Sequence, residues 1–229
     1  MLRPREKFRI YWTETIVDFT HNGLSSIGLV VIISSFVGAV LTIQTAYQLE
    51  GSYFPITIIG SVVSASALLE MAPTVTCLVL AGKIGSNIAS QIGTMRITEQ
   101  IDALEVMGIN PVAYLILPKV VAAVVAFPCL VLVAAFFTVS GGLVAGQLAD
   151  IIQPSDFIFG AQKFHRNYFV LFMCVKALAF GFLITTVSAY QGYFVKGGAV
   201  NVGASSTKAV VYSCIMILVM NYVLAKLML

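Results

Sequence analysis

Two ionisable side chains interrupt otherwise apolar stretches of the sequence. Glu70 lies within segment 56–90 and Lys176 within segment 168–192. A charge at the centre of a bilayer costs at least roughly 2.5 to 3.5 kcal/mol, so such residues are candidates for ion pathways, proton relays or substrate contact. We expect the two at comparable depths, where they either pair or leave one facing a cavity that receives a lipid head group. The alternative is a purely structural ion pair.

Other chemical arrangements are incomplete. His21 and His165 are predicted on opposite sides of the membrane, which disfavours a Ser/His/Asp triad. Gly82-Lys83 has the form of the end of a phosphate-binding loop, but Cys77 stands where that loop needs Gly and Ile84 where it needs Ser or Thr. We therefore predict no catalytic, metal or cofactor site in this chain and expect a transporter component rather than an enzyme.

The polar segment 94–107 is predicted to be one amphipathic helix that ends at Gly108. Its apolar and acidic side chains fall on opposite sides of a helical wheel. The apolar set is Ile97, Ile101, Leu104 and Met107, and the acidic set is Glu99, Asp102 and Glu105. Such a helix between two spans is suited to docking into a groove on a soluble partner. A helix lying on its own membrane is the alternative, but anionic lipid would repel three acidic residues.

The elements that position these residues are those of a membrane protein. The 229 residues are 59% hydrophobic and 10% charged, which excludes an ordinary soluble domain. The net charge of +3 does not indicate nucleic-acid binding, because the basic residues lie at segment ends. We predict an all-α protein with one domain over 1–229 and an N-terminal interfacial helix at 1–22. The predicted spans are 24–49, 56–90, 114–148, 168–192 and 209–229.

The distribution of Lys and Arg predicts the orientation. With a cytoplasmic N-terminus, nine basic residues lie inside and three outside, in agreement with the positive-inside rule. Segment 94–107 is then cytoplasmic and the C-terminus periplasmic. The N-terminal residues lack the features of a signal or transit peptide, which favours a bacterial inner membrane.

Several blocks of sequence carry a resemblance to a known family. They are 69–73, 81–86 and 93–108 with 110–111 and 118–119, followed downstream by 176–181, 190–192 and 197–207. In this order they resemble the signature of MlaE/YrbE-type permeases, the membrane subunits of ABC transporters that work with Mce (mammalian cell entry) domain proteins. Three departures are Lys83 and Lys119 where Arg is expected, and Met71-Ala72 where Leu-Gly is usual.

The resemblance implies a homodimer that moves phospholipid or a related lipid between the inner membrane and an Mce-domain protein, and so contributes to lipid asymmetry of the outer membrane. It implies a separate cytoplasmic ABC ATPase that uses ATP and Mg²⁺, and a small cytoplasmic accessory subunit. By analogy, segment 94–107 is the coupling helix and 196–207 a second contact. The coupling residues are Arg96, Glu99, Ile101, Asp102, Leu104, Glu105 and Met107.

The alternative function is a self-sufficient secondary transporter or channel that uses Glu70 and Lys176 as a relay. Such folds usually contain internal repeats, and no convincing repeat relates the two halves of this sequence. A membrane-embedded lipid enzyme is a weaker option, because no nucleophile and base can be assembled. The acidic docking segment separates these hypotheses, since neither rival has an evident need for it.

Overall fold

The computed structural model describes residues 12–49, 55–163 and 166–228, and every regular element in those ranges is a helix. Five helical runs are long and apolar enough to cross a membrane, as expected from the sequence. They are Trp12–Leu49, Thr57–Ile97, Val112–Leu148, Asn167–Tyr193 and Ala199–Met228. The all-α fold class with five spans is therefore confirmed.

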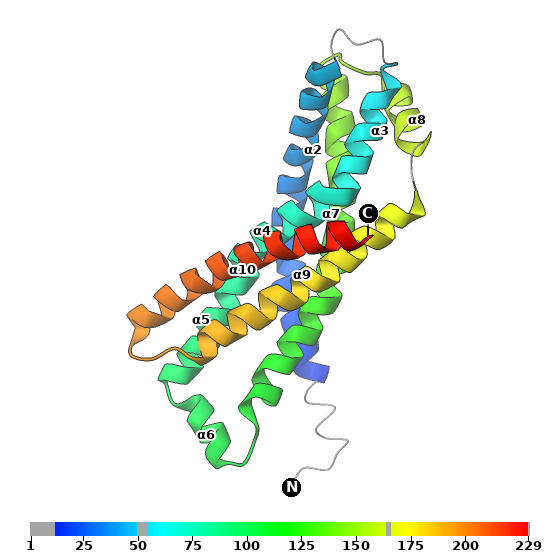
Figure 1. Cartoon of the computed structure of the whole chain (residues 1–229). Coiled ribbons are helices and arrows are strands. Elements are labelled where there is room, and N and C mark those ends of the chain that lie inside the picture. The colour runs from blue at the N-terminus through cyan, green and yellow to red at the C-terminus, as the bar shows by residue number, and fades with distance from the viewer. Residues whose placement is uncertain (1–11, 50–54, 164–165, 229) are drawn as a thin grey trace. The chain divides into compact units, whose positions relative to one another are not determined.

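The individual elements have the following bounds (Figure 1). The first run contains η1 (Phe19–Gly23), η2 (Leu24–Ser26) and α2 (Ile27–Leu49). The second contains α3 (Thr57–Ser66), η3 (Ala67–Val75), α4 (Thr76–Leu80), η4 (Ala81–Gly85) and α5 (Ser86–Ile97). After these come α6 (Gln100–Val106), η5 (Val112–Ile116), α7 (Leu117–Leu148), α8 (Pro154–Lys163), α9 (Asn167–Tyr193) and α10 (Ala199–Met228).

The start of the first span differs from the expected break after an interfacial helix. Residues 1–11 lie outside the described part of the chain, and from Trp12 the helical winding continues into α2. At the expected boundary the chain does not leave the helix; the winding changes to a π-helix in η1 and a 3-10 helix in η2. The Ser25 hydroxyl donates to the His21 carbonyl there. An interfacial position for the N-terminal segment stays a prediction.

The last span begins ten residues earlier than expected, since α10 starts at Ala199 and not near 209. The sequence of this segment is polar and Gly-rich, which favours a loop. Its hydroxyl groups are instead bonded to backbone carbonyls. Ser206 donates to Val202 O at 3.0 Å and Thr207 to Gly203 O at 3.2 Å within the helix, and Ser205 donates to Gln191 O of α9 at 2.6 Å. The turn itself is short and uses Gly197, whose φ of +98° suits glycine.

The chain forms two compact units. Unit 1 contains Met1–Ser25, Cys77–Phe127 and Leu178–Leu229, and unit 2 contains Ser26–Thr76 and Pro128–Ala177. In unit 1, α5 packs on α10, and Gly93 allows this approach because an added Cβ would lie 3.2 Å from Val202. Gly192 of α9 likewise faces the backbone of Ala89.

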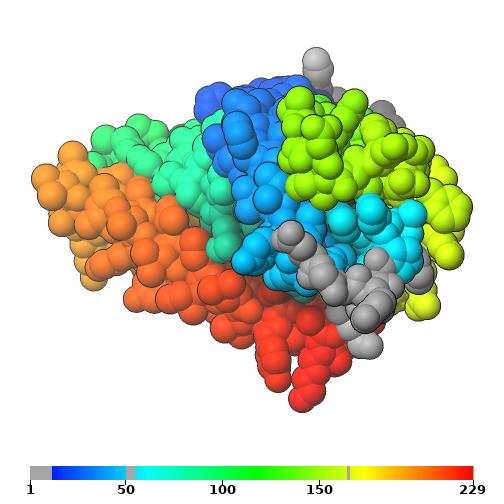
Figure 2. All heavy atoms as spheres, turned by 90° about the horizontal axis from the view of Figure 1, so that it is seen from above, coloured from blue at the N-terminus to red at the C-terminus, as the bar shows by residue number. Residues whose placement is uncertain are grey.

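In unit 2, α8 lies against α3, and the two helices approach at glycines on both sides. A Cβ on Gly60 would come within 2.3 Å of Phe157 O, and one on Gly160 within 1.9 Å of Thr57 O. The Ser61 hydroxyl donates to Gly160 O at 2.8 Å. Seen from above, α3 in cyan and α8 in yellow-green are neighbours (Figure 2). The sequence Pro154-Ser155-Asp156 forms the first turn of α8, and the buried face of this helix closes a small apolar core.

The spans α2 and α7 touch through small residues, which allow helices in a membrane to approach closely. A Cβ on Gly38 would lie 1.8 Å from the carbonyl oxygen of Thr138, and one on Gly141 would lie 2.3 Å from that of Ser35. Backbone atoms cannot move aside as a flexible side chain can. This contact therefore requires glycine at both positions.

We predict opposite effects for two alanine substitutions in α2. Gly38→Ala should lower the free energy of unfolding by at least about 1 to 3 kcal/mol, the usual cost of overpacking. Gly28→Ala is the matched control, because an added Cβ there meets nothing within 4 Å and alanine favours helix by about 1 kcal/mol. Thermal unfolding of each purified variant in detergent measures both effects. Equal midpoints for the two variants would contradict the close approach.

Candidate functional site

The two intramembrane charges predicted from sequence form an ion pair in unit 2. Lys176 Nζ of α9 lies 2.7 Å from Glu70 Oε1 of η3. The ammonium also donates to Leu69 O at 2.9 Å and lies 4.5 Å from the centre of the Phe172 ring. Thr74 donates to the other carboxylate oxygen, Oε2, at 3.2 Å. The sequence left open whether the pair forms, and the structure shows that it does.

Pro73 contributes to this site through the backbone. Proline has no N–H, so it cannot donate to the carbonyl four residues earlier, and its ring disturbs the local winding. That carbonyl belongs to Leu69, which accepts from Lys176 instead. The local winding is that of a π-helix over Ala67–Val75, a form that often occurs at functional sites. The Lys176 side chain thus donates to a backbone carbonyl that Pro73 cannot reach with an α-helical hydrogen bond.

The two partners are unequally enclosed. The Lys176 side chain has no exposed surface, whereas the Glu70 side chain retains 39%. A buried ammonium without its partner is costly, while a carboxylate at the edge of the protein can find other partners. The exposed part of the pair is therefore the Glu70 carboxylate, and the Lys176 ammonium is enclosed behind it.

The predicted helix 94–107 is broken, which corrects the sequence analysis. α5 ends at Ile97, Thr98 closes it by donating from Oγ1 to Thr94 O at 2.8 Å, and Glu99 adopts a left-handed φ of 59°. α6 then starts at Gln100. A helical wheel assumes constant winding, and the wheel carries no information on the break at Thr98-Glu99. The stop at Gly108 is confirmed, with φ +74°.

The break changes which side chains face outward. Ile101 is fully buried and Leu104 half-buried, whereas Val106 and Met107 are 89% and 64% exposed. The expected apolar ridge is therefore divided between the interior and the surface. Glu99, Asp102 and Glu105 are exposed, as the acidic face predicted.

A cluster of polar contacts holds this elbow between α5 and α6. Arg96 Nη1 lies 2.6 Å from Asp102 Oδ1 and joins the two helices. Tyr193, the last residue of α9, donates from its hydroxyl to Glu105 Oε1 at 3.2 Å, and the Arg96 guanidinium lies 5.7 Å from the centre of its ring. Sequence reasoning missed Tyr193, because a tyrosine at the end of an apolar span is also what an interfacial anchor looks like. The acidic residues thus serve partly to brace α6.

Sequence reasoning also did not predict a second set of polar contacts, which two lysines make in unit 1. Lys119 Nζ lies 3.0 Å from Asp18 Oδ1 and donates to Gln91 Oε1 at 2.7 Å. Lys83 donates to Ser25 O at 2.6 Å. These lysines are the two that depart from the expected Arg. Lys119 donates to both carboxylate oxygens of Asp18 and to Gln91, and Lys83 donates to the carbonyl and the hydroxyl of Ser25. In each case one ammonium nitrogen makes several contacts without the fork of a guanidinium.

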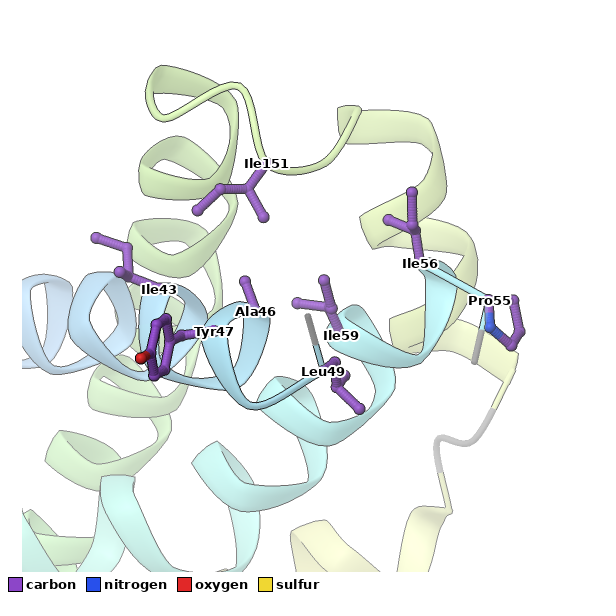
Figure 3. A pocket seen from close by; sticks show the side chains of 8 residues that line it. All are labelled: Ile43, Ala46, Tyr47, Leu49, Pro55, Ile56, Ile59 and Ile151. Atoms are coloured by element: carbon purple, nitrogen blue, oxygen red, sulfur yellow. The ribbon is translucent and has the colours of Figure 1, made fainter. Parts of the chain in front are cut away.

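An apolar pocket of about 410 Å³ opens at the end of unit 2 that carries the α2 C-terminus (Figure 3). Ile43, Ala46 and Tyr47 of α2 line one side, and Ile59 of α3 and Ile151 face them. Among the described residues, no acidic or basic side chain lines it, and Tyr47 contributes its phenol group. The pocket therefore offers apolar surface but no charged side chain, in contrast to the site of the Glu70–Lys176 ion pair.

Comparison with known proteins gives the site its context. The family model for "Permease MlaE" matches residues 15–227. The chain belongs to the MlaE permease family. A probable ABC transporter permease of Synechocystis is 38% identical over 96% of this chain and 83% of its own length. One from Rickettsia bellii is 36% identical over 95% and 84%.

A third relative comes from a plant. The chloroplastic protein TRIGALACTOSYLDIACYLGLYCEROL 1 of Arabidopsis thaliana is 34% identical over 96% of this chain and 63% of its own length. As an MlaE permease with five apolar helical runs, the chain is a multi-pass membrane component of an ABC transporter rather than a catalytic enzyme. Permeases of this class work with an ATPase.

We predict an asymmetric response when the ion pair is broken. Glu70→Gln leaves the enclosed ammonium without a counter-charge and should cost about 3 to 5 kcal/mol of folding free energy. Lys176→Met should cost less, because Glu70 is partly exposed and has Thr74 as a second partner. The double variant should recover most of the loss caused by Glu70→Gln. Thermal unfolding in detergent checks the order, and a larger loss in Lys176→Met than in Glu70→Gln would refute it.

Proposed function

We propose that this chain is the permease subunit of an ABC transporter that moves phospholipid or a related lipid between a bacterial inner membrane and an Mce-domain protein. A separate cytoplasmic ATPase supplies the energy by hydrolysing ATP with Mg²⁺. The working unit is a homodimer, and a small cytoplasmic accessory subunit binds the ATPase side. The N-terminus is cytoplasmic and the C-terminus periplasmic, as the positive-inside distribution predicts.

The observation that carries the proposal is the elbow between α5 and α6 in a member of this family. α6 is braced on two sides, by Arg96–Asp102 and by Tyr193–Glu105, yet it leaves Val106 and Met107 exposed. Exposed apolar side chains on a rigid support, ringed by acidic groups, are typical of an interaction surface. We assign this surface to the ATPase, with Glu99 at the elbow as a further contact.

Lipid as the cargo is supported by the site and by one relative. The spans present apolar surface, and the only ion pair within the described part of η3 and α9 is the one at mid-span. The Arabidopsis relative carries the name of a galactosyl diacylglycerol, which is a lipid. We propose that Glu70, held in place by the enclosed Lys176, faces the polar head of the lipid during transfer, and that Mce-domain partners receive the lipid.

The first test is copurification from cells that express the whole transporter. Val106→Asp should remove most of the copurifying ATPase, because loss of a central interface residue costs about 2 kcal/mol or more. Val106 is chosen because it is 89% exposed, so a change there leaves the bracing contacts intact. The ATPase is identified by mass spectrometry of the tagged complex.

Leu148→Asp is the matched control, an equally drastic change at a residue 81% exposed at the other end of a span. It should leave the ATPase bound. If both variants copurify the ATPase as the unsubstituted protein does, α6 is not the coupling surface. If the unsubstituted protein copurifies no ATPase, the proposal for energy supply fails.

The second test asks whether the ion pair takes part in transfer. The Glu70→Gln, Lys176→Met double variant should fold and bind the ATPase, yet lose ATP-dependent transfer of fluorescent phosphatidylglycerol from proteoliposomes to the Mce-domain protein. Binding of the ATPase in the same preparation separates failed assembly from failed transfer. Normal transfer by the double variant would make the pair purely structural.

A further inference from the structure

Two apolar grooves run along α7 in unit 2, one on each side of the same ridge. The first, the α8-side groove, has a volume of about 590 Å³, and the second, the α2-side groove, about 470 Å³. The α8-side groove is lined by Ser64, Leu68, Leu132, Leu143, Gln162 and Met173. The α2-side groove is lined by Phe36, Ala39, Phe137, Val144 and Leu148. Phe136 and Ser140 line both and form the ridge.

The serine hydroxyls along the grooves already donate to carbonyl groups of the protein. The Ser64 hydroxyl donates to Ser61 O at 3.1 Å, and that of Ser35 to Val31 O at 2.8 Å. The Ser140 hydroxyl donates to Phe136 O. Hydroxyls that bond within their own helix have no unmet need for a polar ligand. The groove walls therefore suit hydrocarbon.

The length of the α8-side groove matches one leaflet of a bilayer. From Leu132 to Leu143, α7 rises about 16 Å at 1.5 Å per residue. Half of a hydrocarbon core of about 30 Å is about 15 Å. Gln162 lies at the α8 end of the groove, and Lys163 and Arg166 follow it in the chain. Positive charge at that end complements an anionic head group.

Two narrow grooves favour hydrocarbon chains over a partner helix. An α-helix about 10 Å across would need on the order of 1,200 Å³ over the same 16 Å, which is at least about twice the volume of either groove. The exposed Phe136 ring, with 67% of its surface free, stands where the axis of such a helix would lie. A lipid with two chains can straddle this ring, with one chain on each side.

We propose that these grooves together hold the two acyl chains of one anionic phospholipid, with its head group at the α8 end and Phe136 between the chains. The site is separate from the Glu70–Lys176 pair and lies on the surface of a single subunit. The inference rests on the proposed function only in taking lipid as a ligand. It supplies a resting position for lipid beside the permease.

Three tryptophan substitutions on α7 test the two-chain site. Leu132→Trp fills the α8-side groove and Val144→Trp the α2-side groove, while Val125→Trp is the matched control outside both. These positions are 45%, 52% and 54% exposed, so each variant is expected to fold. Thermal unfolding verifies this, and native mass spectrometry in detergent measures bound phosphatidylglycerol and its single-chain lyso form.

Each groove variant should weaken binding of phosphatidylglycerol about tenfold, which corresponds to about 1.4 kcal/mol, while the control binds as the unsubstituted protein does. The lyso form should still bind to either single variant and be lost only when both grooves are filled. Unchanged binding of the two-chain lipid in both variants overturns the proposal. Loss in one variant alone also overturns it, because it would indicate a single-chain groove.

A second copy of this chain is the rival occupant. Ser140→Cys chains that form a disulfide-linked dimer, when the unsubstituted protein does not, would place a second copy on the ridge and overturn the proposal. Binding is measured without nucleotide or partner, so its failure leaves the transporter proposal standing. Failure of ATPase copurification, in turn, leaves the lipid site standing.

Discussion

The enclosed ammonium of Lys176 is the constraint around which unit 2 is arranged. A charge in an apolar interior must be paired and fully hydrogen-bonded, or its cost becomes prohibitive. The partners come from one segment: the Glu70 carboxylate and the Leu69 carbonyl. The same segment contains Pro73 and has a π-helical winding over Ala67–Val75. Charge, proline and irregular winding thus occur together at one site.

The same logic explains how polar residues are tolerated elsewhere in the spans. Serine and threonine hydroxyls donate to carbonyls of their own helices, as Thr138 does to Ala134 O and Thr185 to Gly181 O. Glycines let α2 approach α7 and α3 approach α8 closely enough for backbone contact. Helices in a bilayer gain little from burying apolar surface, so close packing of this kind has to hold them together.

The sequence predicts the fold well and the site only in part. Hydropathy locates five spans, because length and apolar content follow directly from membrane thickness. The pairing of Glu70 with Lys176 was one of two open possibilities, since depth along each span limits distance but not rotation. The break at Thr98-Glu99 was missed, because neither residue type prevents a helix and no sequence signal indicates the left-handed φ of Glu99. Tyr193 was missed because its partners lie on α5 and α6, far away in sequence.

The broken helix bears on how the elbow could transmit force. A continuous helix 94–107 would project as an extension of α5 and could bend freely about its base. A short α6 set off by a left-handed residue is instead fixed at both ends, to α5 through Arg96–Asp102 and to the end of α9 through Glu105–Tyr193. A force applied to α6 therefore acts on both α5 and α9 and not on α5 alone. A coupling element needs contacts with more than one membrane helix if a partner's movement is to alter how the helices pack.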